Sequence, residues 1–218
     1  MSAEWLPMLP LPLVLLPEEL LPLHIFEGRY KQMIGECLEA KAREGPGQEF
    51  GLVQAKAEAI ESIGCAARIV NVTNRYPDGR FDIVVIGRRR FEVLYANEET
   101  AYLRCGVFFF EDEPGAEVAG ESEAACAIEL FQHLLRRLRH AKDMPVHLSR
   151  PYRYLSFRIA ASLPLDLDFK QQLLAIRSES KRLTRMTRLM EFLLEKMNQA
   201  DEARKKADGN GDLPRKLS

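Results

Sequence analysis

The sequence has no apolar run long enough to cross a membrane. Its longest apolar stretch, residues 6–16, is interrupted by three prolines, and a spanning helix needs roughly 20 apolar residues. No basic segment precedes this stretch, and no small-residue cleavage site of a signal peptide follows it. We therefore expect a soluble, cytoplasmic protein that does not contact membranes.

Cysteine and histidine are too few and too scattered to build a disulfide framework or a metal site. The four cysteines share no C-x-x-C spacing and stand at Cys37, Cys65, Cys105 and Cys126. We expect reduced and mostly buried thiols. His133, His140 and His147 recur every seven residues, which is about 10.5 Å of helical rise and too far for one metal ion. The sequence therefore predicts no metal and no cofactor.

No recognised catalytic or nucleotide-binding motif is complete. The phosphate-binding pattern G-x-x-x-x-G-K-[ST] is missing, and Gly45-Pro46-Gly47 is not followed by Gly-Lys-Ser/Thr. Ser178 and Lys181 have S-x-x-K spacing, but the S-D-N and K-T-G motifs that accompany it in enzymes are absent. A serine that caps a helix explains this spacing better. We therefore expect no enzyme activity.

Charge is distributed unevenly along the 218 residues, although the net charge is only −1. Residues 1–128 carry 12 Lys and Arg against 21 Asp and Glu, a balance of −9. Residues 129–218 carry 19 against 11, a balance of +8. The two halves should attract each other, or each should face a different kind of partner.

The first half has the pattern of a curved β-sheet. β-Branched and aromatic residues fill residues 63–72 and 81–94, and Tyr76-Pro77-Asp78-Gly79 between them has the chemistry of a turn. Gly87 interrupts the second run and suggests a bulge or bend that curves the sheet toward a barrel. Further strands are expected near residues 9–17, 20–26, 50–53 and 101–110, with one helix near 27–43 that holds Tyr30 in the core.

After Pro114 the apolar period changes from two to about 3.6, which predicts helices. We expect one that Pro145 stops, a shorter one that ends at Pro164, one capped by Asp166 or Asp168, and a long one capped by Ser180. The predicted units are a β-domain over residues 1–115, a helical domain over 116–198 and a disordered polar tail over 199–218.

Several short motifs occur in the order of a known family. Residues 21–30 read LPLHIFEGRY and are similar to its LPL-x-IFE-x-RY pattern. The other motifs are IGCAARI at 63–69, PDG at 77–79, GRRRF at 87–91, SLPL at 162–165, KQQLL at 170–174 and RL at 182–183. Over residues 9–197 the chain thus resembles the N-terminal, substrate-binding domain of the ATP-dependent Lon protease.

This resemblance implies an α+β fold, a PUA-like curved antiparallel β-barrel with one helix followed by a C-terminal helical bundle. Because the motifs of the family's ATPase and peptidase modules are missing, we expect a free-standing member of the family without those domains. The function that follows is a non-enzymatic binding module that recognises exposed or unfolded polypeptide segments or acts as a protein-interaction adaptor.

Strand addition at an open sheet edge, with pockets for side chains, is the physical route that we expect for polypeptide binding. The residues expected to take part are His24, Phe26, Arg29, Arg88 and Arg90. Strand alternation places Arg88 and Arg90 on one face and Arg89 on the other. The three arginines therefore form either a solvated or salt-bridged edge, or part of an anion site.

A second basic region leaves an alternative function open. Between residues 129 and 158, basic residues are interleaved with aromatic ones, a composition that can hold single-stranded RNA. The same residues can instead dock on the acidic first half. This basic face comprises Arg136, Arg137, Arg139, Lys142, Arg150, Arg153 and Arg158.

Overall fold

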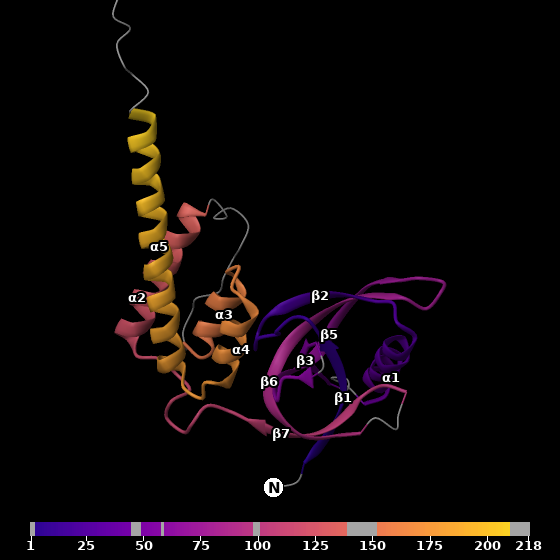
Figure 1. Ribbon diagram of the computed structural model, residues 1–218. Coiled ribbons are helices and arrows are strands. Elements are labelled where there is room, and N and C mark those ends of the chain that lie inside the picture. The colour runs from indigo at the N-terminus through magenta and orange to yellow at the C-terminus, as the bar shows by residue number, and fades with distance from the viewer. Residues whose placement is uncertain (1–2, 45–48, 58, 98–100, 139–151, 210–218) are drawn as a thin grey trace, which may run out of the picture.

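A computed structural model describes residues 3–44, 49–57, 59–97, 101–138 and 152–209, which form a β-rich unit followed by a helical unit (Figure 1). The strands are β1 (Glu4–Leu11), β2 (Leu20–Ile25), β3 (Phe50–Lys56), β4 (Ala59–Ile60), β5 (Ile63–Arg75), β6 (Phe81–Asn97) and β7 (Arg104–Phe110). The helices are α1 (Gly28–Glu44), α2 (Glu121–Arg137), α3 (Leu155–Ala161), α4 (Leu167–Ala175) and α5 (Glu179–Gly209). None of the described helices is long and apolar enough to span a membrane.

Five strands close into a barrel. They are neighbours in the order β1-β7-β6-β5-β3, and β1 also pairs with β3 to complete the ring. The β1–β3 pairing is parallel, whereas the others are antiparallel. A parallel pair needs a long crossover, which β2 and α1 supply here. The expected curved β-barrel is confirmed, with this parallel pairing as a departure from an all-antiparallel sheet.

A bulge in β6 lies directly after Gly87. Ala67 of β5 stands opposite Gly87 and Cys65 stands opposite Arg90, so β6 has one extra residue between the two pairs. Gly87 also permits a close approach, since a Cβ there would lie 2.0 Å from the carbonyl oxygen of Leu16. The glycine therefore allows both the bend and the passage of the chain beneath it.

Side chains fill the barrel interior. Met8, Val53, Phe91 and Val107 are fully buried there, and Leu6 is nearly so. Gly51 and Gly64 leave room for the Phe91 ring, because a Cβ at either position would come within 2.8 Å of its Cζ. The barrel is thus a packed core without a channel through these residues.

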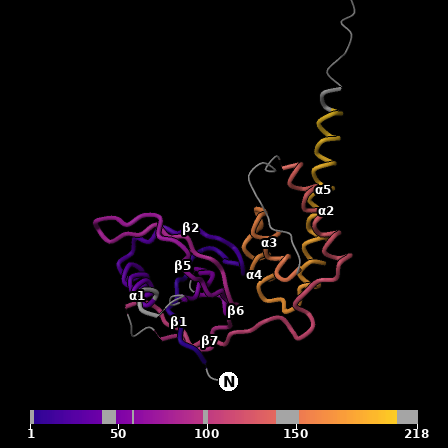
Figure 2. The backbone as a smooth tube through the Cα atoms, turned by 180° about the vertical axis from the view of Figure 1, so that it is seen from behind, coloured from indigo at the N-terminus to yellow at the C-terminus, as the bar shows by residue number. Residues whose placement is uncertain are grey.

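One part of the sheet extends beyond the barrel. There β6 lies between β2 and β5, and this three-stranded sheet projects over α1 (Figures 1 and 2). The β5–β6 hairpin closes through the expected turn, in which Gly79 has φ +83° and donates its N–H to the Tyr76 carbonyl at 3.0 Å. Tyr30 of α1 is buried, as predicted.

In the helical unit, α2 packs along α5, and α3 and α4 lie on the side toward the barrel (Figures 1 and 2). Asp166 caps α4 by accepting the Phe169 N–H at 2.7 Å. The first strand begins and ends earlier than expected, and residues 14–17 are buried outside any strand. Helix α5 continues to Gly209, past residue 199 where we expected the polar tail to begin, and residues 210–218 lie outside the described part.

Candidate functional site

Two arginines and two carboxylates are buried where the barrel meets the helices. Arg182 of α5 donates from Nη1 and Nη2 to the two carboxylate oxygens of Asp112, each at 2.6 Å. Arg90 of β6 donates to the same carboxylate at 2.6 Å and to the Ile176 carbonyl at 2.6 Å. Glu179 accepts a further bond from Arg182 at 2.6 Å. Residues from both units are therefore joined by charge-assisted hydrogen bonds.

An aromatic ring covers the two arginines of this cluster. The Phe157 ring lies 4.3 Å from the Arg182 guanidinium and 5.5 Å from that of Arg90. Burial by itself raises the pKa of Asp112, but hydrogen bonds from Arg182 and the charges of both arginines outweigh it, so the pKa lies below its ordinary value. The carboxylate is therefore charged at neutral pH and holds the two units together.

The position of Arg90 does not suit the polypeptide-binding role that the sequence suggested. Its side chain is 2% exposed and bonded on every side by the cluster. Strand alternation predicted that Arg88 and Arg90 share a face, but the bulge adds one residue and returns Arg90 to the face of Gly87. Arg89, between them, is salt-bridged to Glu49 at 3.2 Å.

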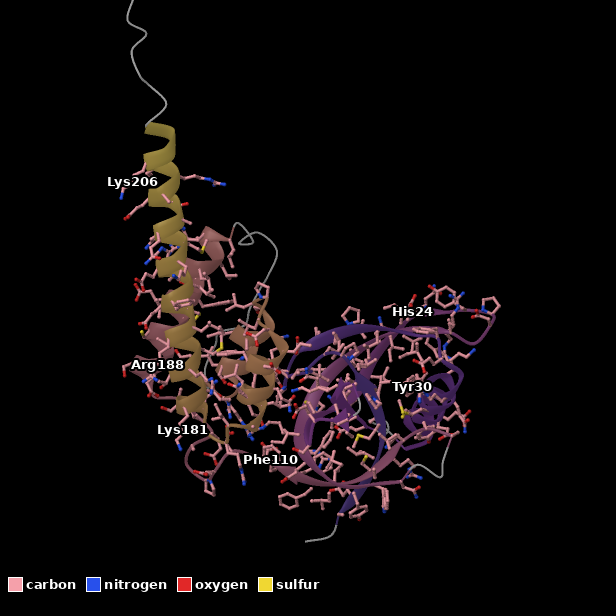
Figure 3. The ribbon with its side chains drawn as sticks, viewed as in Figure 1. His24, Tyr30, Phe110, Lys181, Arg188 and Lys206 are labelled. Atoms are coloured by element: carbon pink, nitrogen blue, oxygen red, sulfur yellow. The ribbon has the colours of Figure 1, made fainter. Side chains whose placement is uncertain are left out.

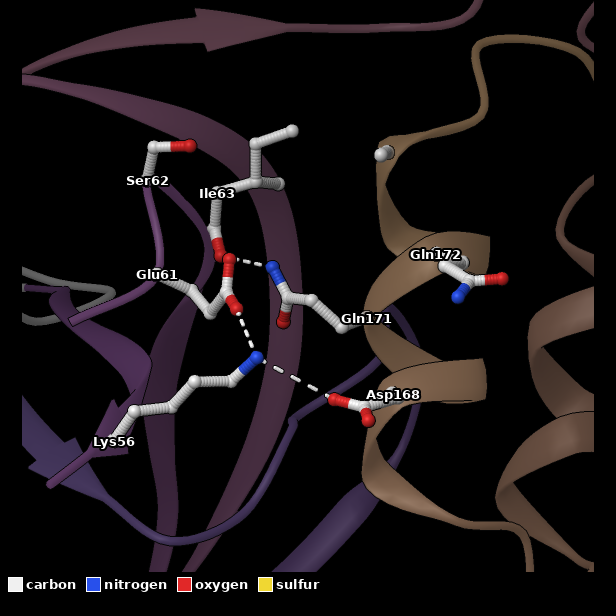
Figure 4. A pocket seen from close by; sticks show the side chains of 8 residues that line it. Lys56, Glu61, Ser62, Ile63, Asp168, Gln171 and Gln172 are labelled. Atoms are coloured by element: carbon white, nitrogen blue, oxygen red, sulfur yellow. Dashed lines mark hydrogen bonds and ion pairs between the residues drawn. The ribbon is translucent and has the colours of Figure 1, made fainter. Parts of the chain in front are cut away.

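A polar pocket of about 410 Å³ lies between the barrel and α4 (Figure 4). Lys56 crosses it with ion pairs to Glu61 at 2.7 Å and to Asp168 at 3.4 Å. Gln171 donates to the Ile63 carbonyl at 2.9 Å, while its Oε1 is buried without a partner in the described residues. Because its charged groups already pair across the boundary, the pocket serves mainly as a second contact between the two units.

The three-stranded extension has one face toward the core and one toward solvent. Residues directly opposite each other in adjacent strands share a face, and alternate residues along a strand return to it. The solvent side consists of three rows, which we call the open face: Leu20–Ile86–Arg68, Pro22–Val84–Asn71 and His24–Asp82–Asn74. The other side includes buried Ile25, Ile69, Ile83 and Val85, which pack in the core with α1.

The first two rows of the open face are largely apolar yet accessible. Leu20 is 61% exposed, Pro22 is exposed, and Val84 and Ile86 are half-buried. An apolar surface on the outer side of a sheet is typical of a binding site when it is contiguous. The open face therefore offers apolar contact next to the barrel and polar contact farther out.

A polar and aromatic group forms the outer end of the open face. His24 Nδ1 lies 2.5 Å from Asp82 Oδ1, and the Tyr76 hydroxyl donates to Asp82 Oδ2 at 2.7 Å. Hydrogen bonds from His24 and then Tyr76 lower the pKa of Asp82. Phe26 stacks on His24 with ring centroids 5.9 Å apart and is 61% exposed. In Figure 3 His24 lies above Tyr30, on the strands that project over α1.

The remaining predicted polypeptide-binding residues lie in different places. Arg29 begins α1, where it pairs with Glu27 at 2.9 Å and covers the Tyr30 ring. Arg88 lies in the bulge between Gly87 and Arg90, which share the core-facing side, so Arg88 points to the opposite side, that of Ile86, at the barrel end of the open face. The structure thus brings His24, Phe26 and Arg88 to one surface, whereas Arg29 belongs to α1 and contacts Glu27 and Tyr30.

The described members of the basic face contact other parts of the same chain, except Arg136, which is exposed. Arg137 pairs with Asp201 at 2.6 Å, Arg153 pairs with Glu111 at 3.3 Å, and Arg158 donates to the Arg153 carbonyl at 3.0 Å. The Arg153–Glu111 pair joins the basic second half to the acidic first half. Arg139, Lys142 and Arg150 lie outside the described residues.

Ser178 and Lys181 are not arranged as a reactive pair. The Ser178 hydroxyl accepts the backbone N–H of Lys181 at 3.4 Å, in the manner of a helix cap. The Lys181 side chain is exposed on α5, whereas Ser178 is buried. Among the described residues no group of His, Cys, Asp and Glu has the arrangement of a metal site.

Sequence reasoning placed His24 among the binding residues, but it missed the apolar rows of the open face and the buried cluster. In β2, which reads LLPLHI, both faces are rich in apolar residues, so alternation does not reveal the exposed one. Only the register with β6 and β5 assigns Leu20, Val84 and Ile86 to solvent. The one signal for the cluster was charge: an arginine-rich second half that should attract an acidic first half.

Comparisons with known proteins agree with this architecture. The family model described as "ATP-dependent protease La (LON) substrate-binding domain" matches residues 5–191. A Lon protease from Solibacter usitatus (strain Ellin6076) is 27% identical over 147 residues, which cover 66% of this chain and 18% of that protein. The chain therefore matches less than a fifth of this relative's length.

Two solved structures have the same fold. One is a Lon N-terminal domain protein from Xanthomonas campestris, with a TM-score of 0.64, 23% identity, and coverage of 84% of this chain and 96% of that one. The other is the N-terminal domain of the Mycobacterium avium complex Lon protease, with a TM-score of 0.63, 20% identity, and coverage of 86% and 98%. The barrel is accordingly PUA-like, and the chain belongs to the LON substrate-binding domain family.

Proposed function

We propose that this chain is a non-enzymatic module that captures exposed, extended polypeptide segments on the open face and along the free edge of β2. The observation that carries the proposal is a pair of largely apolar, partly exposed rows on a sheet whose outer strand, β2, pairs with β6 alone among the described strands. Membership of a substrate-binding domain family supports it. We expect this activity in the cytoplasm, where segments of unfolded chains become accessible.

The backbone of β2 is prepared for strand addition. Gly87 donates its N–H to the Glu19 carbonyl at 2.9 Å. Because hydrogen-bonded pairs alternate along an antiparallel ladder, the backbone groups of Leu20, Pro22 and His24 then point to the free edge. Pro22 has no N–H, so the edge offers carbonyls at all three positions but donors at only two. The missing N–H donor at Pro22 limits indiscriminate pairing of this edge and still permits a short added strand.

Side-chain contacts supply the rest of the affinity. Leu20 and Phe26 are among the most exposed large apolar residues described. Covering them removes apolar surface from water at about 25 cal/mol per Å². The surface is small compared with a stable interface, so we expect weak binding with a Kd on the order of micromolar.

The test is a titration of a fluorescently labelled, reduced and alkylated protein, which stays unfolded, with the purified chain. Leu20→Ser and Phe26→Ala should each weaken binding by roughly tenfold, corresponding to about 1.4 kcal/mol. Phe192→Ala is the matched control, because Phe192 is 52% exposed on α5, away from the sheet. Equal losses in all three variants, or no binding by the unaltered chain, would refute the proposal.

Salt separates this function from RNA binding. Apolar contact is little affected by ionic screening, so polypeptide binding should survive a several-fold increase in salt. RNA binding would weaken as salt increases. Each neutralised phosphate would steepen the fall of log affinity with log salt concentration by about 0.7. Most described residues of the basic face already contact the chain itself, which favours the polypeptide. Tight RNA binding that Arg136→Glu with Arg153→Glu abolishes would favour the alternative.

A further inference from the structure

Arg68 and Arg88 occupy neighbouring positions at the barrel end of the open face. Arg68 of β5 stands opposite Ile86, and Arg88 lies two residues beyond Ile86 on the same side of β6. Both side chains are half-buried. Neither has a hydrogen bond or ion pair from its side chain to any residue in the described parts of the chain.

Carboxylates near this end are already engaged. Glu19 accepts the Leu16 N–H at 2.8 Å and the Lys170 ammonium at 3.1 Å. Glu49 accepts a bond from Arg89 at 3.2 Å. Arg68 and Arg88 are diagonal neighbours on adjacent strands, close enough for two long side chains to reach one group. Two half-buried arginines whose side-chain donors have no partner among the described residues therefore form a site for an external carboxylate, which arginine recognises through paired N–H groups.

The geometry of the open face indicates which carboxylate it receives. A segment that runs along the face toward the barrel passes Val84 and Ile86 and then reaches the barrel core. Phe91, Met8 and Val53 fill that core, so the segment has no path through it. A chain that ends there meets the two arginines with its terminal carboxylate, whereas a chain that continues must turn away from the sheet.

We propose that Arg68 and Arg88 bind the C-terminal carboxylate of a polypeptide whose last residues are extended and apolar at alternate positions. This inference rests on the proposed function and names the class of segment that it captures. The apolar side chains cover Leu20, Val84 and Ile86, and the carboxylate accepts hydrogen bonds from the two guanidinium groups. Capture is thereby directed to free chain ends rather than to any apolar stretch.

The test compares three forms of one short synthetic peptide with alternating apolar residues. The first has a free C-terminal carboxylate, and the second has a C-terminal amide. The third ends in an added aspartate with an amidated C-terminus, so its only carboxylate at that end is on a side chain. Hydrogen bonds to charged groups are stronger than those between neutral groups, so the free acid should bind at least roughly tenfold more tightly than the plain amide. Equal affinities of these two, or equally tight binding of the aspartate form, would overturn the proposal.

Variants identify the site. Arg68→Ala with Arg88→Ala should bring the affinity for the free acid down to that for the amide and leave the amide unchanged. Arg136→Ala is the control, since Arg136 is exposed on α2 in the other unit. If the double variant still distinguishes acid from amide, the arginines are not the site.

The unfolded test protein distinguishes this failure from that of the proposed function. If that protein binds and Leu20→Ser weakens its binding, but acid and amide peptides do not differ, only the C-terminal inference fails. If neither the protein nor any peptide binds, the proposed function fails as well.

Discussion

Asp112 and Arg182 face each other across the boundary between the barrel and the helices, with both carboxylate oxygens and two guanidinium nitrogens paired at 2.6 Å. Asp112 follows the last barrel strand and Arg182 lies in the first turns of α5. Both side chains are at most 2% exposed. This buried pair couples the orientation of the helical unit to that of the barrel.

Removing Asp112 should therefore destabilise the whole chain. Asp112→Ala leaves Arg90 and Arg182 buried without a carboxylate between them, and breaking such a pair costs about 3–5 kcal/mol. Urea denaturation should show this loss in the free energy of unfolding. Arg188→Ala, an exposed change in the same helix as Arg182, should alter it by less than about 0.5 kcal/mol. A loss below about 1 kcal/mol for Asp112→Ala would contradict this account.

The same pair predicts how stability depends on pH. The pKa of Asp112 is lower in the folded chain than in the unfolded one, where it is about 3.9. Its contribution to stability is therefore complete above about pH 5 and is lost as the pH falls through the unfolded and then the folded pKa. Asp112→Asn should be less stable at neutral pH but should lose less stability than the unaltered chain between neutral pH and pH 2. If the free energy of unfolding falls equally with decreasing pH in the variant and in the unaltered chain, Asp112 makes no contribution to acid sensitivity.

The sequence predicts turns, helix caps and apolar stripes well, because each is determined by residues close together in the chain. The turn at Pro77-Asp78-Gly79, the cap at Asp166 and the buried stripe of α1 were recognisable because each depends on residues close in sequence. The parallel pairing of β1 with β3 was not, since it joins strands separated by α1. The bulge beside Gly87 was expected, but its effect on the direction of Arg90 required the register.

The end of α5 shows a different limit. The polarity of the residues after Gln199 favours a tail, but the stretch contains Ala, Glu, Arg and Lys, which are among the residues with the highest intrinsic helix propensities. With α2 holding its first half in place, α5 continues without an apolar stripe. The composition excluded a core there, but it did not exclude a helix.

Glycine replacements test the close approach at the bulge. Gly87→Ala would place a Cβ 2.0 Å from the backbone oxygen of Leu16, so the two chain segments must separate. We expect a loss of about 1–3 kcal/mol in the free energy of unfolding. Gly35→Ala in α1 is the matched control, because nothing lies within 4 Å of a Cβ added there. Alanine in a helix is also more favourable than glycine by about 0.5–1 kcal/mol. Similar stabilities of the two variants would show that the Leu16 contact is not tight.

Thiol reactivity tests the packing of the barrel interior, which contains Cys105, and of the core beneath α1, which contains Cys37 and Cys65. Burial raises the pKa of Cys37 to about 12, and it also raises those of Cys65 and Cys105. A thiol reacts as its thiolate, so these three should resist alkylation at neutral pH, while exposed Cys126 on α2 should react. Mass spectrometry after brief alkylation should show one modified cysteine in the folded chain and four in denaturant. Cys126→Ser should abolish the native labelling, and rapid labelling that persists in this variant would mean that the barrel or the α1 core opens readily.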